Sequence, residues 1–310
     1  MLALTVVLAR MAQFACAMIL LGSPLFFIYG LPVQGPGAAK DLPWPRPVLL
    51  GAGVVLGLAA AVSFFAQTAV MTGSIADALD PGSLVSVFTD TQFGQATVTR
   101  LGLALLAALV LNVAKPSRGL WLVTSILGAG MVASVAWSGH GAVGDGMGRL
   151  VHLASDVLHL VAAAVWLGAL AVLCILLFRT RAMVTNELGA IHHALRSFSG
   201  VGSGVVAVLL ATGLANSWFL IGTAHVAEVT TTTYGLLLLA KVGLFGIMLM
   251  LAAVNRFHLT PRLGAALERP ASTAVAVAAL RRSVLLETAL GALVLVLVSL
   301  LGTLAPLSAQ

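Results

Sequence analysis

The sequence predicts an all-α protein, a polytopic membrane helix bundle with eight transmembrane helices and both termini on the periplasmic side. Of the 310 residues, 60% are hydrophobic and only 8% are charged, whereas a soluble globular domain carries about 25% charged residues. The mean hydropathy is +1.09, and the apolar residues fall into eight separate runs. This composition excludes a soluble enzyme, a disordered chain and a nucleic-acid-binding module, and it makes the lipid bilayer the expected partner.

Each run is long enough to cross the hydrocarbon core as a helix, which takes about 20 mostly apolar residues. The strands of a β-barrel would alternate apolar and polar residues, but a run such as 291–301 is apolar on every face. The first run continues too far for a cleaved signal peptide, so we expect the chain to retain it as the first helix. The eight runs cover residues 4–29, 48–71, 96–114, 119–138, 150–178, 197–222, 235–257 and 283–305.

The connections between these runs differ in charge, and the difference predicts the orientation. The loops at 30–47, 115–118, 179–196 and 258–282, with Arg256 at a helix end counted in, contain Lys40, Arg46, Lys115, Arg118, Arg179, Arg181, Arg196, Arg256, Arg262, Arg269, Arg281 and Arg282. The loops on the other side, at 72–95, 139–149 and 223–234, contain one basic residue, Arg149. Lysine and arginine stay on the cytoplasmic side, so we expect both termini to face outward. The polar stretch 72–95 predicts a sizeable loop with a short surface helix.

Several ionisable residues fall inside the predicted spans. A charged side chain at a helix centre costs about 2.5–3.5 kcal/mol on insertion scales, so such groups usually pair or line a wet cavity. Their positions relative to the helix ends predict an outward-open polar cavity, with Glu287 alone in an inner half. The alternative is ion pairs that lock the bundle, for example Asp156 with Arg100 or Lys241. The residues are Arg10, Arg100, Asp156, His159, Lys241 and Glu287, with His152 at the outer mouth of the fifth helix.

The fifth predicted helix carries His152, Asp156 and His159 at positions i, i+4 and i+7, which lie on one face of a helix. Trp166 extends this stripe, and His140 lies in the glycine-rich outer loop that precedes the helix. Neutral imidazoles are favoured ligands for copper and zinc, and a carboxylate can ligate the ion or orient an imidazole. Two histidines two turns apart are about 10.5 Å apart along the axis, which suits two stations along a path better than one compact site.

Soft donors near this stripe are Met131, close to the outer end of the fourth helix, and Met147 in the outer loop. Spacing alone leaves four interpretations open, namely metal binding, a proton relay, haem ligation and plain packing. Cys16 and Cys174 lie deep inside apolar runs, so they indicate neither a disulfide framework nor a thiolate cage. Small apolar packing groups are the simpler interpretation of both.

Several segments follow one another in an order typical of a known family. The most specific are Ser138-Gly-His-Gly141, His152, Asp156, His159 and Trp166-Leu-Gly168. Others are Thr89-Asp-Thr-Gln-Phe-Gly94 with Arg100, Phe198-Ser199 through Gly213-Leu-Ala-Asn216, Tyr234-Gly235 with Lys241, Asn255-Arg256, Pro261, and Arg281-Arg282 through Glu287. The ordered set resembles the CopD/PcoD family of bacterial copper-resistance inner-membrane proteins over nearly the whole chain.

The resemblance implies a multi-pass protein of the bacterial inner membrane that binds a copper ion and moves it from periplasm to cytoplasm. It also implies a periplasmic copper-carrier protein as a partner. An importer of this kind would be expected to carry methionine-rich runs outside, but the outer loops contain only Met147, which leaves Cu(I) and Cu(II) both open. The resemblance implies one integral membrane domain over 1–310, with helices 1–5 and an outer histidine site in 1–180 and CopD-like helices 6–8 in 181–310.

Carried over residue by residue, the resemblance makes His140, His152 and His159 candidate copper ligands. Asp156 is a further ligand or orients one of the histidines. Arg100, Lys241 and Glu287 match family positions, but the resemblance gives them no role.

Two other functions remain open. One is a membrane redox protein with b-type haem, which needs facing histidines on two helices, and the other is a structural or sensor subunit that binds metal without moving it. Enzymatic activity is not expected, because the chain has neither a G-x-S-x-G elbow nor an H-E-x-x-H motif. A P-loop is also absent, which excludes ATP-driven pumping within this chain.

Overall fold

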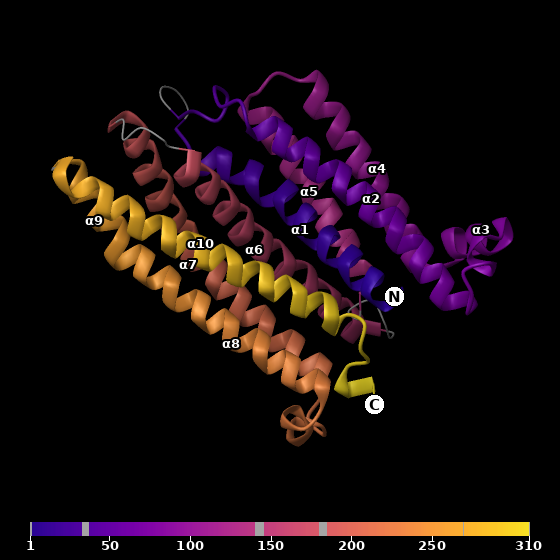
Figure 1. Cartoon of the computed structure of the whole chain (residues 1–310). Helices are drawn as coiled ribbons and strands as arrows, with labels where there is room; N and C mark the ends of the chain where they lie inside the picture. The colour runs from indigo at the N-terminus through magenta and orange to yellow at the C-terminus, as the bar shows by residue number, and fades with distance from the viewer. Residues whose placement is uncertain (1, 33–36, 140–145, 180–184, 269, 310) are drawn as a thin grey trace.

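The computed structural model describes residues 2–32, 37–139, 146–179, 185–268 and 270–309, and these residues form helices joined by short connections, without a β-strand. The long helices are α1 (Leu2–Tyr29), α2 (Pro45–Thr72), α4 (Gln92–Val113), α5 (Arg118–Trp137), α6 (Gly146–Arg179), α7 (Thr185–Ile221), α8 (Thr233–Val254) and α10 (Pro270–Leu301) (Figure 1). The short ones are η1 (Asp77–Leu79), α3 (Pro81–Asp90), η3 (Val226–Thr230), the π-helical turn η4 (Asn255–Leu259), α9 (Thr260–Leu267) and η5 (Leu307–Ala309).

Eight helices in the described part of the chain are long and apolar enough to cross a membrane, and each coincides with one of the eight predicted runs. The short helix expected within 72–95 is α3. The side chain of Asp80 caps it by accepting from the Ser83 N–H at 3.0 Å, and Pro81 occupies its first turn, where a missing N–H costs nothing.

The predicted loops at 179–196 and 258–282 are wrong over most of their length. Helix α7 already begins at Thr185, α8 continues through η4 and α9 to Leu267, and α10 begins at Pro270. A helix such as α6, with 34 residues, measures about 51 Å at 1.5 Å per residue and exceeds the roughly 30 Å hydrocarbon core. Hydropathy detects only the part of a helix that lies in lipid. A prediction from hydropathy therefore starts these helices too late and ends them too early.

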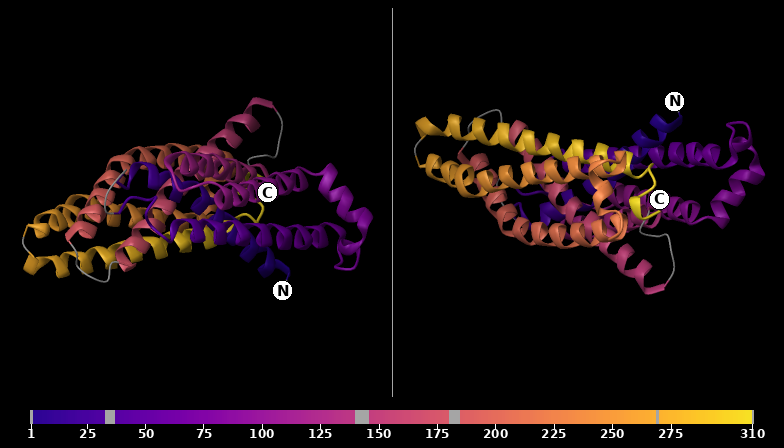
Figure 2. Two further views of the ribbon diagram at one scale, coloured as in Figure 1. Left: turned by 90° about the horizontal axis from the view of Figure 1, so that it is seen from above. Right: turned by 90° about the horizontal axis from the view of Figure 1, so that it is seen from below.

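Both termini lie at the end of the bundle that carries η3 and α3, and α9 lies at the opposite end (Figure 1). Two further views show the same separation of α3 and α9 (Figure 2). This arrangement is what an even number of crossings requires. The basic connections predicted to be cytoplasmic therefore belong to the α9 end.

Helix α1 lies in the centre and packs against α2, α5, α6 and α10. Its contact with α6 is close because two glycines face each other: a Cβ added at Gly168 would lie 2.5 Å from the Gly22 Cα. One added at Gly128 of α5 would lie 2.5 Å from the backbone N of Leu21. The Ser23 hydroxyl donates to the Gly168 carbonyl at 3.2 Å. Small residues that let backbones approach are typical of helix interfaces in membranes.

Helices α7 and α8 flank a groove. Helix α7 packs on α6 and α8 packs on α10, while α7 and α8 make little direct contact. Residues of α6 and α10 therefore form the floor between them, and the cavities described below lie over this floor.

Candidate functional site

The polar stripe of α6 faces α7. Helix α7 runs antiparallel to α6 and presents three residues that span the same total of seven positions. The α6 residues are His152, Asp156 and His159, and the α7 residues opposite them are Phe219, Asn216 and Thr212 in that order. Each member of the stripe thus has one partner across the interface, which holds the three side chains in place.

Thr212 determines which ring nitrogen of His159 carries the hydrogen. The Thr212 hydroxyl donates to the carbonyl of Val208 at 2.6 Å, so its oxygen acts as the acceptor for His159 Nδ1, which lies 2.9 Å away. Nδ1 therefore carries the hydrogen, and Nε2 keeps its lone pair in the neutral imidazole. Nε2 is the ring nitrogen that Thr212 does not contact, and the His159 ring lines a cavity.

Asp156 and Asn216 form the middle contact. Asn216 Nδ2 donates to Asp156 Oδ1 at 3.2 Å. Asn216 is 8% exposed, and its Oδ1 is buried with no hydrogen-bond partner among the described residues. A buried carbonyl oxygen without a partner is costly, and here it lies in the lining of the same cavity. This cavity can therefore offer a cation two kinds of oxygen, a carboxylate and an amide.

His152 is held by stacking. Its ring lies parallel to Phe219, with ring centroids 4.7 Å apart and an interplanar angle of 13°. The side chain is buried, and neither ring nitrogen is hydrogen-bonded to a described residue. Stacking restrains the ring plane but leaves both nitrogens available.

These side chains converge on one cavity of about 160 Å³, which we call the histidine cavity. Five of the ionisable residues singled out from the sequence line it, whereas Arg100 lies elsewhere and Glu287, expected apart from the others, lines a different cavity. The polar lining of the histidine cavity comes from α1, α6, α7 and α8: Arg10, His152, Asp156, His159, Asn216, Tyr234 and Lys241. A second cavity of about 200 Å³ adjoins it and shares His159 and Lys241 in its lining.

The ion pairs considered from sequence do not form. Arg100 is buried, and its guanidinium donates to the Ser134 hydroxyl at 3.1 Å, the Ser134 carbonyl at 2.9 Å and the side chain of Gln13. The reason is position: α4 packs on α2 and α5, not on α6, so Arg100 reaches α1 and α5 instead of Asp156. Lys241 lines the same cavity as Asp156, but no nitrogen–oxygen pair of the two lies within 4.0 Å.

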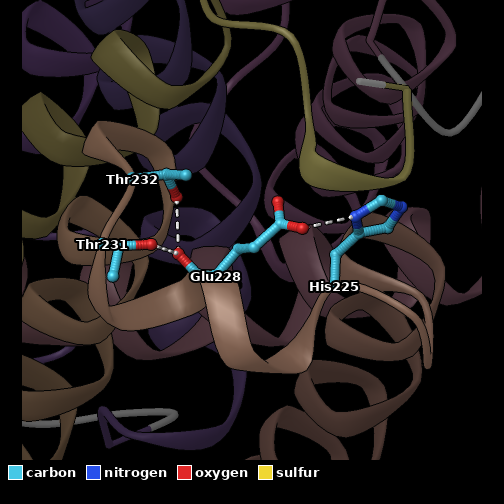
Figure 3. Close-up of polar contacts among 4 residues, drawn as sticks. All are labelled: His225, Glu228, Thr231 and Thr232. Carbon is cyan, nitrogen blue, oxygen red and sulfur yellow. Dashed lines mark hydrogen bonds and ion pairs between the residues drawn. The ribbon is translucent and has the colours of Figure 1, made fainter.

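In the connection before α8, His225 Nδ1 lies 3.2 Å from Glu228 Oε1, a contact that becomes an ion pair when the imidazole is protonated. Figure 3 shows the Glu228 carboxylate facing this ring, while the hydroxyls of Thr231 and Thr232 point to the Glu228 carbonyl oxygen. Thr232 also caps α8 by accepting from the Gly235 N–H at 3.2 Å. This connection fixes the start of α8, and with it the place of Lys241 two turns later.

The candidate metal ligands are not all brought together. No three His, Cys, Asp or Glu side chains in the described ranges are close enough to hold one ion, as the two-turn separation of the histidines leads one to expect. His140 lies outside the described residues. Met131 is fully buried in the hydrophobic core, Met147 is 74% exposed, and neither lines the histidine cavity.

Sequence reasoning did not identify Met18, Thr212, Asn216 and Phe219 as parts of the site. Met18 lines the cavity together with Arg10 and Phe14. These three residues follow one another at intervals of four, which predicts that they share one face of α1. Asn216 and Thr212 were missed because polar residues on α7 reveal their role only once α6 is placed opposite.

Residues 1–150 match the family described as copper resistance protein D-like, N-terminal domain, and residues 192–301 match the family described as copper resistance protein D. No solved structure matches the chain. The chain is 33% identical over 299 residues to copper resistance protein D of Pseudomonas syringae pv. tomato, which covers 96% of this chain and 95% of that protein. It is 32% identical over 216 residues to copper transport protein CutJ of Bacillus subtilis (68% of this chain, 39% of that protein) and 33% identical over 218 residues to inner membrane protein YebZ of Escherichia coli (70% of each). With two family matches and a relative aligned over almost its entire length, the chain belongs to the copper resistance protein D family.

Proposed function

We propose that this chain binds copper in the histidine cavity and carries it across the bacterial inner membrane, from periplasm to cytoplasm. The observation that carries the proposal is the His159 ring, whose Nε2 is left free by the Thr212 contact in a cavity that also contains His152 and Asp156. Relatives named for copper resistance, copper transport and the inner membrane support it. Copper is here a transported substrate.

The orientation in this proposal rests on charge. Outside the membrane-crossing parts of the helices, lysine and arginine gather at the α9 end, in connections and helix ends, whereas Arg149, in the first turn of α6, is the basic residue on the other side. Since basic residues stay cytoplasmic, the histidine cavity lies towards the periplasm. Its residues would take copper from that side.

Each side chain has a distinct part in binding. His159 offers Nε2 as a neutral imidazole donor, and Asp156 supplies negative charge beside it. His152 lies two turns before His159 on α6, about 10.5 Å away along the helix axis. We propose that His152 is a separate binding position, which an ion from the periplasm reaches before it reaches His159. His140, which precedes α6 in the sequence and lies outside the described residues, is a further ligand in this proposal. The outer loops contain only Met147 as a soft donor, so we include delivery by a periplasmic copper-carrier protein.

The first test compares the detergent-purified protein with the double variant His152→Ala/His159→Ala by metal analysis and visible absorption. We expect stoichiometric copper in the unmodified protein, loss of that copper in the variant, and no Soret band. Iron together with a Soret band would instead indicate a haem redox protein and overturn the proposal. Equal copper in both proteins would show that the metal binds elsewhere.

Removing the Thr212 hydroxyl tests the role of the His159 tautomer. Thr212→Val preserves shape but removes the acceptor for Nδ1, so we expect copper affinity to fall about 10–100-fold, as is typical when a contact that orients a ligand is lost. Thr212→Ser keeps the hydroxyl and is expected to bind like the unmodified protein. Competition titration against a copper chelator measures both. Equal affinity in the valine variant would contradict the assigned role.

A further inference from the structure

A third cavity lies in the half of the groove nearer α9. Its volume is about 320 Å³, and we call it the glutamate cavity because Glu287 is the one carboxylate in its lining. Glu287 is 1% exposed. Trp166 Nε1 donates to its Oε1 at 2.7 Å, and Asn255 Nδ2 donates to its Oε2 at 2.8 Å. Side chains from α6, from η4 and from α10 thus meet at this carboxylate.

Asn255 is positioned by the π-helical turn η4. The turn ends at Leu259, two residues before Pro261. Proline has no N–H and its ring clashes with the carbonyl four residues earlier, which here belongs to Phe257, and a wider turn relieves both problems. Such π-turns within α-helices frequently occur at functional sites. With Nδ2 committed to Glu287, the Asn255 Oδ1 is buried and has no hydrogen-bond partner in the described ranges.

Among the described residues Glu287 has no counter-charge beside it in this cavity, so its carboxylate must take up either a proton or a cation. Both donors to Glu287 are neutral, and the described residues place no basic nitrogen within 4.0 Å of its oxygens. Arg256 also lines the cavity, but its guanidinium is bound to the Ser199 carbonyl at 2.8 Å and to the Ser203 hydroxyl. A buried carboxylate without a counter-charge is expensive in a membrane. Glu287 and the free Asn255 Oδ1 offer oxygen donors to a cation that enters this cavity.

The three cavities form a series along the groove. The histidine cavity and the middle one share six lining residues, among them His159 and Lys241, so the two cavities adjoin. The middle cavity and the glutamate cavity have Trp166 in common. Trp166 is buried, and its ring lies edge-on to Phe245 with centroids 6.0 Å apart. The Trp166 indole therefore lies between the middle cavity and the glutamate cavity, and it donates a hydrogen bond to the Glu287 carboxylate.

We propose that Glu287 and Asn255 form a second cation station, which receives copper from the histidine cavity, and that the Trp166 side chain is the barrier between the two. This inference rests on the proposed function, because it assigns the route of the same ion. It explains why a carboxylate is buried far from the histidines. It also explains why that carboxylate is held by the residue that closes the middle cavity.

The test measures binding and transport separately. Copper affinity is measured on purified Glu287→Gln, and copper uptake is measured in proteoliposomes that contain a copper-sensitive fluorescent chelator. We expect Glu287→Gln to bind copper in the histidine cavity like the unmodified protein but to transport it about tenfold or more slowly, because the charge that balances the ion is gone. Glu187→Gln, which neutralises an exposed carboxylate in the first turn of α7, is the matched control and should transport normally.

Normal transport by Glu287→Gln, with transport lost in His159→Ala, would overturn the second station and leave the proposed function intact. Absence of copper binding by the unmodified protein would overturn the proposed function itself. If Glu287→Gln does not fold, Asn255→Ala decides the matter, since it removes the second oxygen donor without altering charge. Transport by Asn255→Ala at the unmodified rate would then contradict the station.

Discussion

Replacing His159 with alanine is expected to weaken copper binding more than about 100-fold, equivalent to about 2.8 kcal/mol. The substitution removes the imidazole that lines the histidine cavity with Nδ1 held by Thr212, and alanine supplies no nitrogen donor in its place. The fold should persist, because alanine is the best helix former and the ring borders a cavity instead of filling the core. Isothermal titration or chelator competition measures the affinity, and a thermal melt checks the fold.

His193→Ala is the matched control for this variant. His193 is an exposed histidine near the other end of α7, so its removal tests whether any histidine contributes to copper binding by the purified protein. We expect it to bind copper normally. If His159→Ala bound copper as tightly as His193→Ala, the histidine cavity would not be the binding site.

The largest effect on stability is expected for Gly168→Leu. The glycine of α6 faces Gly22 of α1 so closely that even a Cβ would lie 2.5 Å from the Gly22 Cα, and the Ser23 hydroxyl binds the Gly168 carbonyl. A leucine must push the two backbones apart, and we expect a loss of about 3 kcal/mol or more in the free energy of unfolding. Unfolding in detergent, followed by circular dichroism, measures it.

Gly243→Leu provides the comparison on α8. A Cβ at Gly243 would meet nothing within 4 Å, so the leucine side chain extends into open space, and its higher helix propensity favours the helix. We expect unchanged or slightly higher stability. An equal loss in both variants would mean that added bulk in any helix destabilises the protein, and that the contact between α1 and α6 is not special.

Much of the fold could be predicted from the sequence because a bilayer imposes a length. Every apolar run became a helix, and the polar stripe of His152, Asp156 and His159 does lie on one face that lines a cavity. The helix ends could not be predicted, since α7 begins at Thr185 among polar residues that suit a helix outside the lipid as well as a loop.

The α7 residues that contact His152, Asp156 and His159 could not be predicted from the sequence, for a different reason. Which α7 residue faces which α6 residue depends on the axial register of the two helices, and hydropathy carries no information on this register. Arg100 illustrates the same limit: its burial was predictable, but its partners Gln13 and Ser134 follow from the neighbours of α4.

The matched spacing across α6 and α7 has a consequence for how this protein can change. His152 meets Phe219 and His159 meets Thr212, so seven residues separate the outer pair of contacts on both helices. Inserting or deleting one residue between Thr212 and Phe219 would turn one end of α7 by 100° relative to the other and detach at least one contact. Single substitutions along this interface are expected to leave α7 packed on α6 even where they weaken copper binding, whereas a change in the length of α7 between these contacts would disrupt the packing itself.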